Sequence, residues 1–156
     1  MSVSLILIPL AVAAVAAAHG ARSTRDGTGQ VVCEVRTRMR DERLLAAALQ
    51  ETGAAVTAED HAIAARWDGV AARFARGTDG VWSAHFTGDV DESRAVEIAR
   101  TVDAGYGRQV QRVVLERLRE RAPAAGLSLE SETTTEDAAV RLVFAVGQEV
   151  RDVDHA

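Results

Sequence analysis

A chain of 156 residues has room for one domain of ordinary size and a short appendage, so two full-size domains are excluded. Hydrophobic residues make up 47% and charged residues 26% of the chain, which excludes a disordered or collagen-like protein. The 18 basic residues are all arginine, and with 23 acidic residues they give a formal net charge of -5, which disfavours a general nucleic-acid binder.

The chain begins with an uncharged apolar run over residues 3–18. A helix of these residues would be roughly 24 Å long against a hydrocarbon core of about 30 Å, so a membrane span also needs residues 1–2 and 19–20. Arg22 and Arg25 are the first charged residues after the run, and the positive-inside rule places them in the cytoplasm. We therefore predict an anchor helix over residues 1–20 and a single-pass membrane protein with its carboxyl-terminal domain in the cytoplasm.

Two alternatives for this apolar run stay open. A secretory signal peptide cleaved near Ala16 or Ala18 would export the protein, although no basic residue precedes the run as such signals require. A buried amino-terminal helix is the other alternative.

A linker and one folded domain are predicted to follow. Residues 21–30 are rich in Gly, Ser, Thr and Asp without apolar periodicity, which indicates a flexible linker. The periodic pattern begins at Val31 and ends before Gly147, and acidic residues follow it. We expect an α+β domain over residues 31–147 and a frayed tail over residues 148–156.

The first part of this domain combines a strand with a short helix. Residues 31–39 alternate between apolar and polar side chains, and this period of two predicts a strand with one buried face. The single cysteine, Cys33, falls on the buried face, where a thiol acts as a small hydrophobe. Asp41 is a candidate N-cap for an amphipathic helix that ends at Gly53.

A meander of three strands is predicted next. The Asp68-Gly69 pair lies between two alternating segments, and such a pair predicts a tight hairpin with a two-residue loop. The register of this hairpin places three residue pairs on one face: Ile63 with Phe74, Ala65 with Ala72, and Trp67 with Val70. A second turn over residues 77–80 leads to a third strand over residues 81–86.

A long helix is predicted over residues 92–121, because apolar side chains recur there every three or four positions. Gly105 and Gly107 each cost a helix interior up to about 1 kcal/mol relative to alanine, so we expect a kink or break between them. Two strands follow the helix, one from Leu127 and one over residues 140–146. The predicted fold is α+β, with one mainly antiparallel sheet in the order β-α-β-β-β-α-β-β, two helices on one face and a preceding hydrophobic helix.

Two groups of side chains are candidates for binding. Arg36, Arg38 and Arg40 alternate along the outer face of the first strand and could bind an acidic partner or phosphate, although a solvated face or a charge-protected edge strand explains them as well. Three aromatic residues mark a candidate pocket for a small molecule or nucleotide between sheet and helices: Trp67, Trp82 and Tyr106. Neither a metal nor a cofactor is predicted, because ligand spacing and a phosphate-binding loop are both missing from the sequence.

An enzyme built on His61, His85 and Asp89 is a further alternative, since these groups could form an acid-base or metal site. The alternation places His85 on the outward face. Asp89 belongs to an acidic cluster at the start of the long helix, where acidic residues favour the helix dipole. We therefore predict a protein without enzymatic activity.

Over residues 31–146 the chain resembles the family called domain of unknown function 1257, also known as hypothetical chloroplast open reading frame 35. The likeness lies in the opening EVRTRMRDERLLAAALQETGAAV, the DG turn in GTDGVW, and the ending VLERLRERAPAAGLSLESETTTEDAAVRLVF. The resemblance implies an accessory role with no activity to carry over, beside an ATPase of the AAA type. We predict a membrane-anchored interaction module that binds a protein partner through its sheet face or the three arginines, and that binds no nucleic acid.

Overall fold

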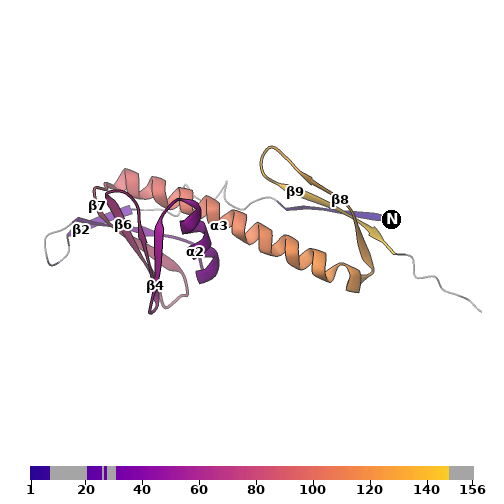
Figure 1. The fold of residues 1–156 in the computed structure, drawn as a ribbon, viewed down its shortest axis with the longest axis horizontal. Helices are drawn as coiled ribbons and strands as arrows, with labels where there is room; N and C mark the ends of the chain where they lie inside the picture. Colours follow the sequence, from indigo (N-terminus) through magenta and orange to yellow (C-terminus); the bar gives the residue numbers. More distant parts are fainter. Residues whose placement is uncertain (8–20, 26, 28–30, 148–156) are drawn as a thin grey trace, which may run out of the picture. The chain divides into compact units, whose positions relative to one another are not determined.

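The structure, a computed structural model, describes residues 1–7, 21–25, 27 and 31–147. The chain divides into two compact units, one of residues 10–110 and one of residues 1–9 with 111–156 (Figure 1). Helix α3 (Glu92–Arg121) contributes residues to both units. The predicted α+β class with antiparallel sheets is confirmed, but each unit has its own sheet where one sheet was predicted.

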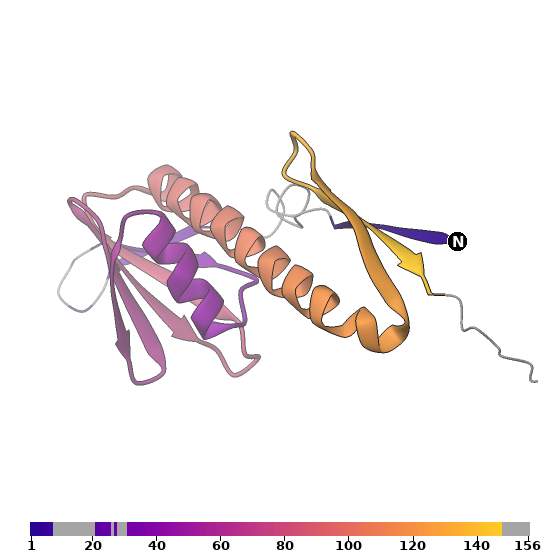
Figure 2. The same ribbon diagram turned by 45° about the vertical axis from the view of Figure 1, so that its right-hand side comes forward.

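The unit of residues 10–110 contains a six-stranded antiparallel sheet in the order β2-β3-β7-β6-β5-β4. Its strands are β2 (Ala21–Arg25), β3 (Val31–Arg36), β4 (Ala55–Glu59), β5 (Ala62–Arg66), β6 (Val70–Arg76) and β7 (Trp82–Gly88). Helix α2 (Glu42–Glu51) and the first part of α3 pack on the same side of this sheet in one hydrophobic core (Figures 1 and 2). The sheet therefore has one face covered by helices and one open face.

Helix α2 begins where the sequence predicts it. The Asp41 carboxylate accepts hydrogen bonds from the backbone N–H groups of Arg43 (2.9 Å) and Leu44 (3.1 Å), which satisfies two donors that the first helical turn leaves unpaired. The helix ends before Gly53, whose φ of 79° suits a residue without a Cβ atom.

The β5–β6 hairpin confirms the predicted register. Ala65 lies opposite Ala72 and Ile63 opposite Phe74, all buried on the helix side. The backbone N–H of Trp67 donates to the carbonyl oxygen of Val70 at 2.8 Å, which closes the predicted two-residue loop.

Helix α3 is continuous over residues 92–121, so the predicted break at Gly105 and Gly107 is absent. Gly105 is buried where α3 passes α2, and a Cβ atom there would lie 3.4 Å from the Cβ of Ala48. The missing side chain thus permits the two helices to approach closely, and tertiary packing outweighs the low helix propensity of glycine.

The other unit contains a three-stranded antiparallel sheet in the order β1-β9-β8. Its strands are β1 (Ser2–Leu7), β8 (Leu127–Thr134) and β9 (Val140–Val146). Leu142 and Phe144 of β9 pack with Leu115 of α3 in a second, smaller core. A 3-10 turn over Pro123–Ala125 and Gly126, with a φ of 70°, connect α3 to β8 as the sequence predicts.

The predicted anchor helix over residues 1–20 is wrong where the structure describes it. Ser2–Leu7 form strand β1, in which Leu5 lies opposite Leu142 and Val3 opposite Phe144 of β9. The apolar side chains of this segment therefore pair with a sheet strand. No helix within the described ranges is long and apolar enough to cross a membrane, so the predicted single-pass membrane localisation is corrected. Residues 8–20 lie outside the described residues.

Part of the predicted linker forms a strand as well. Ala21–Arg25 make up β2, which pairs with β3 so that Arg22 lies opposite Glu34 and Ser23 opposite Cys33. Cys33 is buried, as its position in the alternation predicts. The predicted tail over residues 148–156 lies outside the described residues.

Gly88, at the end of β7, offers a test of how tightly the sheet is packed near the β5–β6 turn. Its φ is 99°, and a Cβ atom added to it would lie 2.5 Å from the carbonyl oxygen of Gly69. We expect Gly88→Ala to lower the free energy of unfolding by at least about 2 kcal/mol, because backbone strain of about 1–3 kcal/mol adds to this clash. Urea unfolding measures the change.

Gly53→Ala is the matched control, since Gly53 has a similar φ of 79° and nothing within 4 Å of an added Cβ atom. Gly53→Ala should lower the free energy of unfolding by about 1–2 kcal/mol, which is the cost of the left-handed backbone conformation for alanine. Equal losses of stability in the two variants would contradict the close approach of Gly88 to Gly69.

Candidate interaction surface

The three arginines of the predicted strip lie in three different environments in the structure. Arg38 forms a two-point ion pair with Asp103 of α3, with Nε–Oδ1 and Nη2–Oδ2 distances of 3.1 Å and 2.9 Å. Asp103 is 1% exposed. A buried carboxylate needs such a partner, so this pair connects the segment after β3 to the helix.

Arg40 belongs to a junction between α2, α3 and the sheet. The Tyr106 hydroxyl accepts hydrogen bonds from the backbone N–H groups of Arg40 (3.2 Å) and Asp41 (3.0 Å). The backbone carbonyl of Arg40 accepts a hydrogen bond from the Trp82 indole N–H at 3.3 Å. The Arg40 guanidinium donates to the carbonyl of Asp79 at 3.0 Å. These contacts hold the loop before α2 in place.

Arg36 alone of the three lies on the open face of the sheet, opposite Ser83 of β7. The strand ends at Arg36. Thr37 and Met39 beyond it are still buried in alternation, but Arg38 and Arg40 contact Asp103 of α3 and the carbonyl of Asp79. The three arginines therefore do not form one continuous strip.

The three predicted pocket aromatics do not line one cavity. Trp82 is 1% exposed in the core. Trp67 stacks on Phe86 with ring centroids 6.4 Å apart, and its indole N–H donates to the Thr52 hydroxyl at 3.0 Å. The Tyr106 hydroxyl accepts hydrogen bonds from the backbone that precedes α2. Trp67 lines a small cavity of about 160 Å³ together with Thr52 and Ile98, and neither Trp82 nor Tyr106 belongs to its lining.

The residues of the predicted acid-base group also lie on separate elements. His61 lies in the turn between β4 and β5 with a φ of 59°, and His85 lies on the open face of β7. Asp89 follows β7, and its backbone N–H donates to the Gly69 carbonyl at 2.9 Å.

The open face of the six-stranded sheet lies on the side opposite α2 and α3. We define the open face as the side chains of β3 to β7 that alternate with the buried ones. They are Val32, Glu34, Arg36, Ala55, Thr57, Glu59, Ala62, Ala64, Arg66, Ala71, Arg73, Ala75, Ser83, His85 and Thr87, of which Ala62 is itself buried. More than half of them are Ala, Ser or Thr, whereas a solvated sheet face usually carries longer polar side chains.

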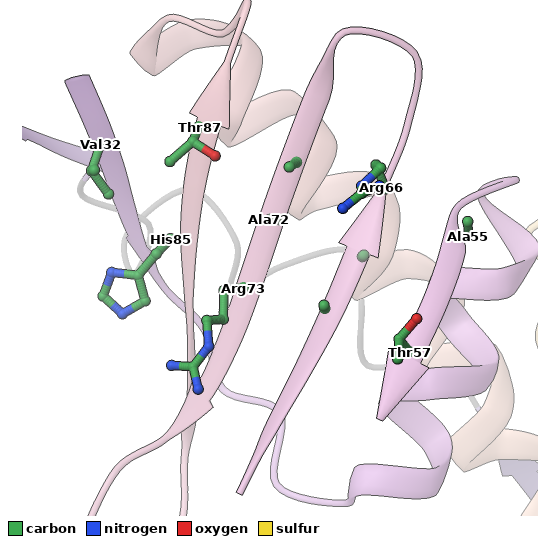
Figure 3. A pocket seen from close by; sticks show the side chains of 11 residues that line it. Val32, Ala55, Thr57, Arg66, Ala72, Arg73, His85 and Thr87 are labelled. Carbon is green, nitrogen blue, oxygen red and sulfur yellow. The ribbon is translucent and has the colours of Figure 1, made fainter. Parts of the chain in front are cut away.

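The short side chains leave a hollow of about 480 Å³ on this face. Its floor is formed by small residues of β5 and β6, among them Ala64 and Ala71. Arg66, Arg73 and His85 belong to its lining, and Figure 3 shows them on neighbouring strands with the helices behind the sheet. The hollow thus combines an apolar floor with basic groups around it.

Cross-strand pairing defines how these groups are arranged. Arg73 lies between His85 of β7 and Ala64 of β5 in one row across the sheet, and Glu34 of β3 lies opposite His85. Arg73 forms an ion pair with Glu59 at 3.1 Å, with both side chains well exposed. The Arg66 side chain has no ion pair or hydrogen bond within the part of the chain that the structure describes.

The sequence contains a signal for this surface in the outward positions of its predicted strands. Ala62 and Ala64, and Ala71 and Ala75, stand where a solvated antiparallel strand usually has polar residues. Comparisons with protein-family models, curated proteins and solved structures give no match for this chain. The family resemblance therefore stays a prediction from the sequence.

Proposed function

We propose that this chain is a protein-interaction module that binds a partner protein on the open face of its six-stranded sheet. The observation that supports the proposal is the hollow of about 480 Å³ between short side chains on the side of the sheet opposite α2 and α3. Exposed small and apolar side chains gathered on one side of a domain mark contact sites in many proteins.

The size of the face fits a transient complex. The five strands β3 to β7, of about six residues each, span roughly 19 Å by 20 Å, which gives a footprint of about 400 Å². A standard interface buries about 800 Å² on each partner, so the open face alone suits a weaker and reversible contact.

The alternative of a small-molecule or nucleotide pocket has less support. Trp67, Trp82 and Tyr106 pack or form hydrogen bonds inside the unit, as described above. Pockets for small ligands are mostly enclosed and lined by large apolar side chains, whereas the hollow has an open floor of alanine. The first partner to test is an ATPase of the AAA type, because the family resemblance suggests it.

Site-specific photo-crosslinking tests the proposal. A benzoyl-phenylalanine at position Ala64 reports on the open face, and the same residue at Arg100, exposed on α3, is the matched control. We expect an adduct of one defined mass from Ala64 only, and competition by an excess of the wild-type chain.

The protein in that adduct is then purified and titrated with the chain. We expect Ala64→Trp to weaken binding of the partner at least about tenfold, because the indole fills the hollow in which the partner binds. Equal affinity of the wild type and Ala64→Trp for the purified partner would contradict the proposal, as would identical adducts from the two positions.

A further inference from the structure

We infer that the bound segment of the partner is acidic and that it places two carboxylates on Arg66 and Arg73. This inference rests on the proposed function and names the chemistry of the partner. It follows from the charges around the hollow, the spacing of the two arginines and the accessibility of their guanidinium groups.

The charge around the hollow is basic. Among the described residues that line it, the ionisable ones are Arg66, Arg73 and His85, with no Asp or Glu. Glu34 and Glu59 lie on the same open face, and Glu59 pairs with Arg73, so the positive charge at the hollow that no carboxylate balances is that of Arg66. An acidic segment is therefore attracted to the guanidinium groups at the hollow.

The two arginines are placed to act together. Arg66 of β5 lies opposite Ala71, and Arg73 follows two residues later on β6, so they are diagonal neighbours on one face. Diagonal neighbours in an antiparallel pair lie about 7–8 Å apart. Carboxylates at positions i and i+2 of an extended segment are about 7 Å apart, which matches this spacing.

The guanidinium groups are accessible for this contact. Arg66 has no ion pair in the described chain, and the exposed pair of Arg73 with Glu59 contributes no more than about 1 kcal/mol. Arg66 has Ala55 and Ala71 as its cross-strand neighbours, whereas Arg73 lies between Ala64 and His85, so Arg66 is the less crowded of the two. Arginine binds carboxylates through two parallel hydrogen bonds, a geometry that lysine cannot provide.

A peptide of alternating Glu and Thr with a fluorescent label is the probe, and the same peptide with Gln for Glu is its control. We expect fluorescence anisotropy of the full chain to show at least about tenfold tighter binding of the Glu peptide, equivalent to about 1.4 kcal/mol. Added salt should weaken this binding, because exposed charges are screened.

Variants assign the effect to the two arginines. Arg66→Gln with Arg73→Gln should remove the preference for the Glu peptide, whereas Arg100→Gln on α3 removes one charge elsewhere and should preserve it. Equal binding of the Glu and Gln peptides would overturn the inference. So would an equal loss in Arg100→Gln, or tighter binding of a single-stranded oligonucleotide than of the Glu peptide.

The outcome for the partner separates this inference from the proposed function. If the partner identified at Ala64 binds the double arginine variant as tightly as the wild type, the acidic segment is overturned and the proposed function stands. If the Glu peptide depends on both arginines but Ala64→Trp leaves the affinity of the purified partner unchanged, the proposed function is overturned.

Discussion

Asp103→Ala should lower the free energy of unfolding of residues 10–110 by about 3 kcal/mol. Removal of one member of a buried ion pair costs about 3–5 kcal/mol, because the remaining charge loses its partner. The lower end applies here, since the Arg38 side chain is 33% exposed and can turn toward water, whereas Asp103 is 1% exposed. Tryptophan fluorescence during urea unfolding measures this unit selectively, because Trp67 and Trp82 both lie within it.

The surface pair of Arg94 and Glu97 provides a matched control on the same helix. Its nitrogen–oxygen distance of 2.9 Å equals that of the closest contact between Arg38 and Asp103, but its side chains are 58% and 66% exposed. Glu97→Ala should therefore cost less than about 1 kcal/mol. If Asp103→Ala lowered the free energy of unfolding no more than Glu97→Ala does, the contact of Arg38 with Asp103 would not stabilise the packing of α3 on the sheet.

Local signals in the sequence predict much of the unit of residues 10–110. The N-cap at Asp41, the hairpin at Asp68-Gly69 and the limits of α3 all depend on residues close together in the chain. The continuity of α3 through Gly105 cannot be predicted from nearby residues, because it depends on contact with Ala48 of α2. Local propensity is informative where no distant contact competes with it.

Three strands were not predicted, each for a physical reason. The continuous apolar run of β1 is compatible with helix or strand, and its partner β9 lies at the other end of the chain. The polar strand β2 is recognisable only by its pairing with β3. Strand β4 has five residues and little alternation, and it becomes a strand by pairing with β5 at the sheet edge.

The candidate site could be predicted only in part. Alternation correctly places Arg36 and His85 on the outward face, because both lie within regular strands. It fails for Arg38 and Arg40, which follow the end of β3 and turn toward α3 and the 77–80 turn. Which arginines share a surface depends on strand order, and that order is a tertiary property.

Phe86→Ala should be the most destabilising substitution in this unit, with a loss of about 3–5 kcal/mol as for other buried phenylalanines. Phe86 is fully buried on β7, and its ring contacts Trp67 in a stacked arrangement and Phe74 edge to face, with centroids 6.4 Å and 6.3 Å away. Each aromatic contact adds about 0.5–1.5 kcal/mol to the burial of the ring, so the upper half of the range applies.

Phe86→Leu is the control, because it keeps an apolar side chain of similar volume and should cost about 1.5 kcal/mol. The emission of Trp67 should shift to longer wavelength in the alanine variant, since water can enter the space beside its ring. Similar losses of stability in the two variants would mean that the core collapses around the missing ring and that the aromatic contacts contribute little.

The same position separates stability from binding. Phe86 lies between His85 and Thr87 along β7 but faces the helices, so it supports the open face without forming part of it. Phe86→Leu should therefore keep its affinity for the Glu-Thr peptide within about twofold, because distant sites contribute nearly independently. Arg66→Gln should show the reverse, with near-normal stability and weakened binding. If peptide binding instead followed stability across these variants, the loss in Arg66→Gln would reflect a general change in the sheet and not a contact with a carboxylate.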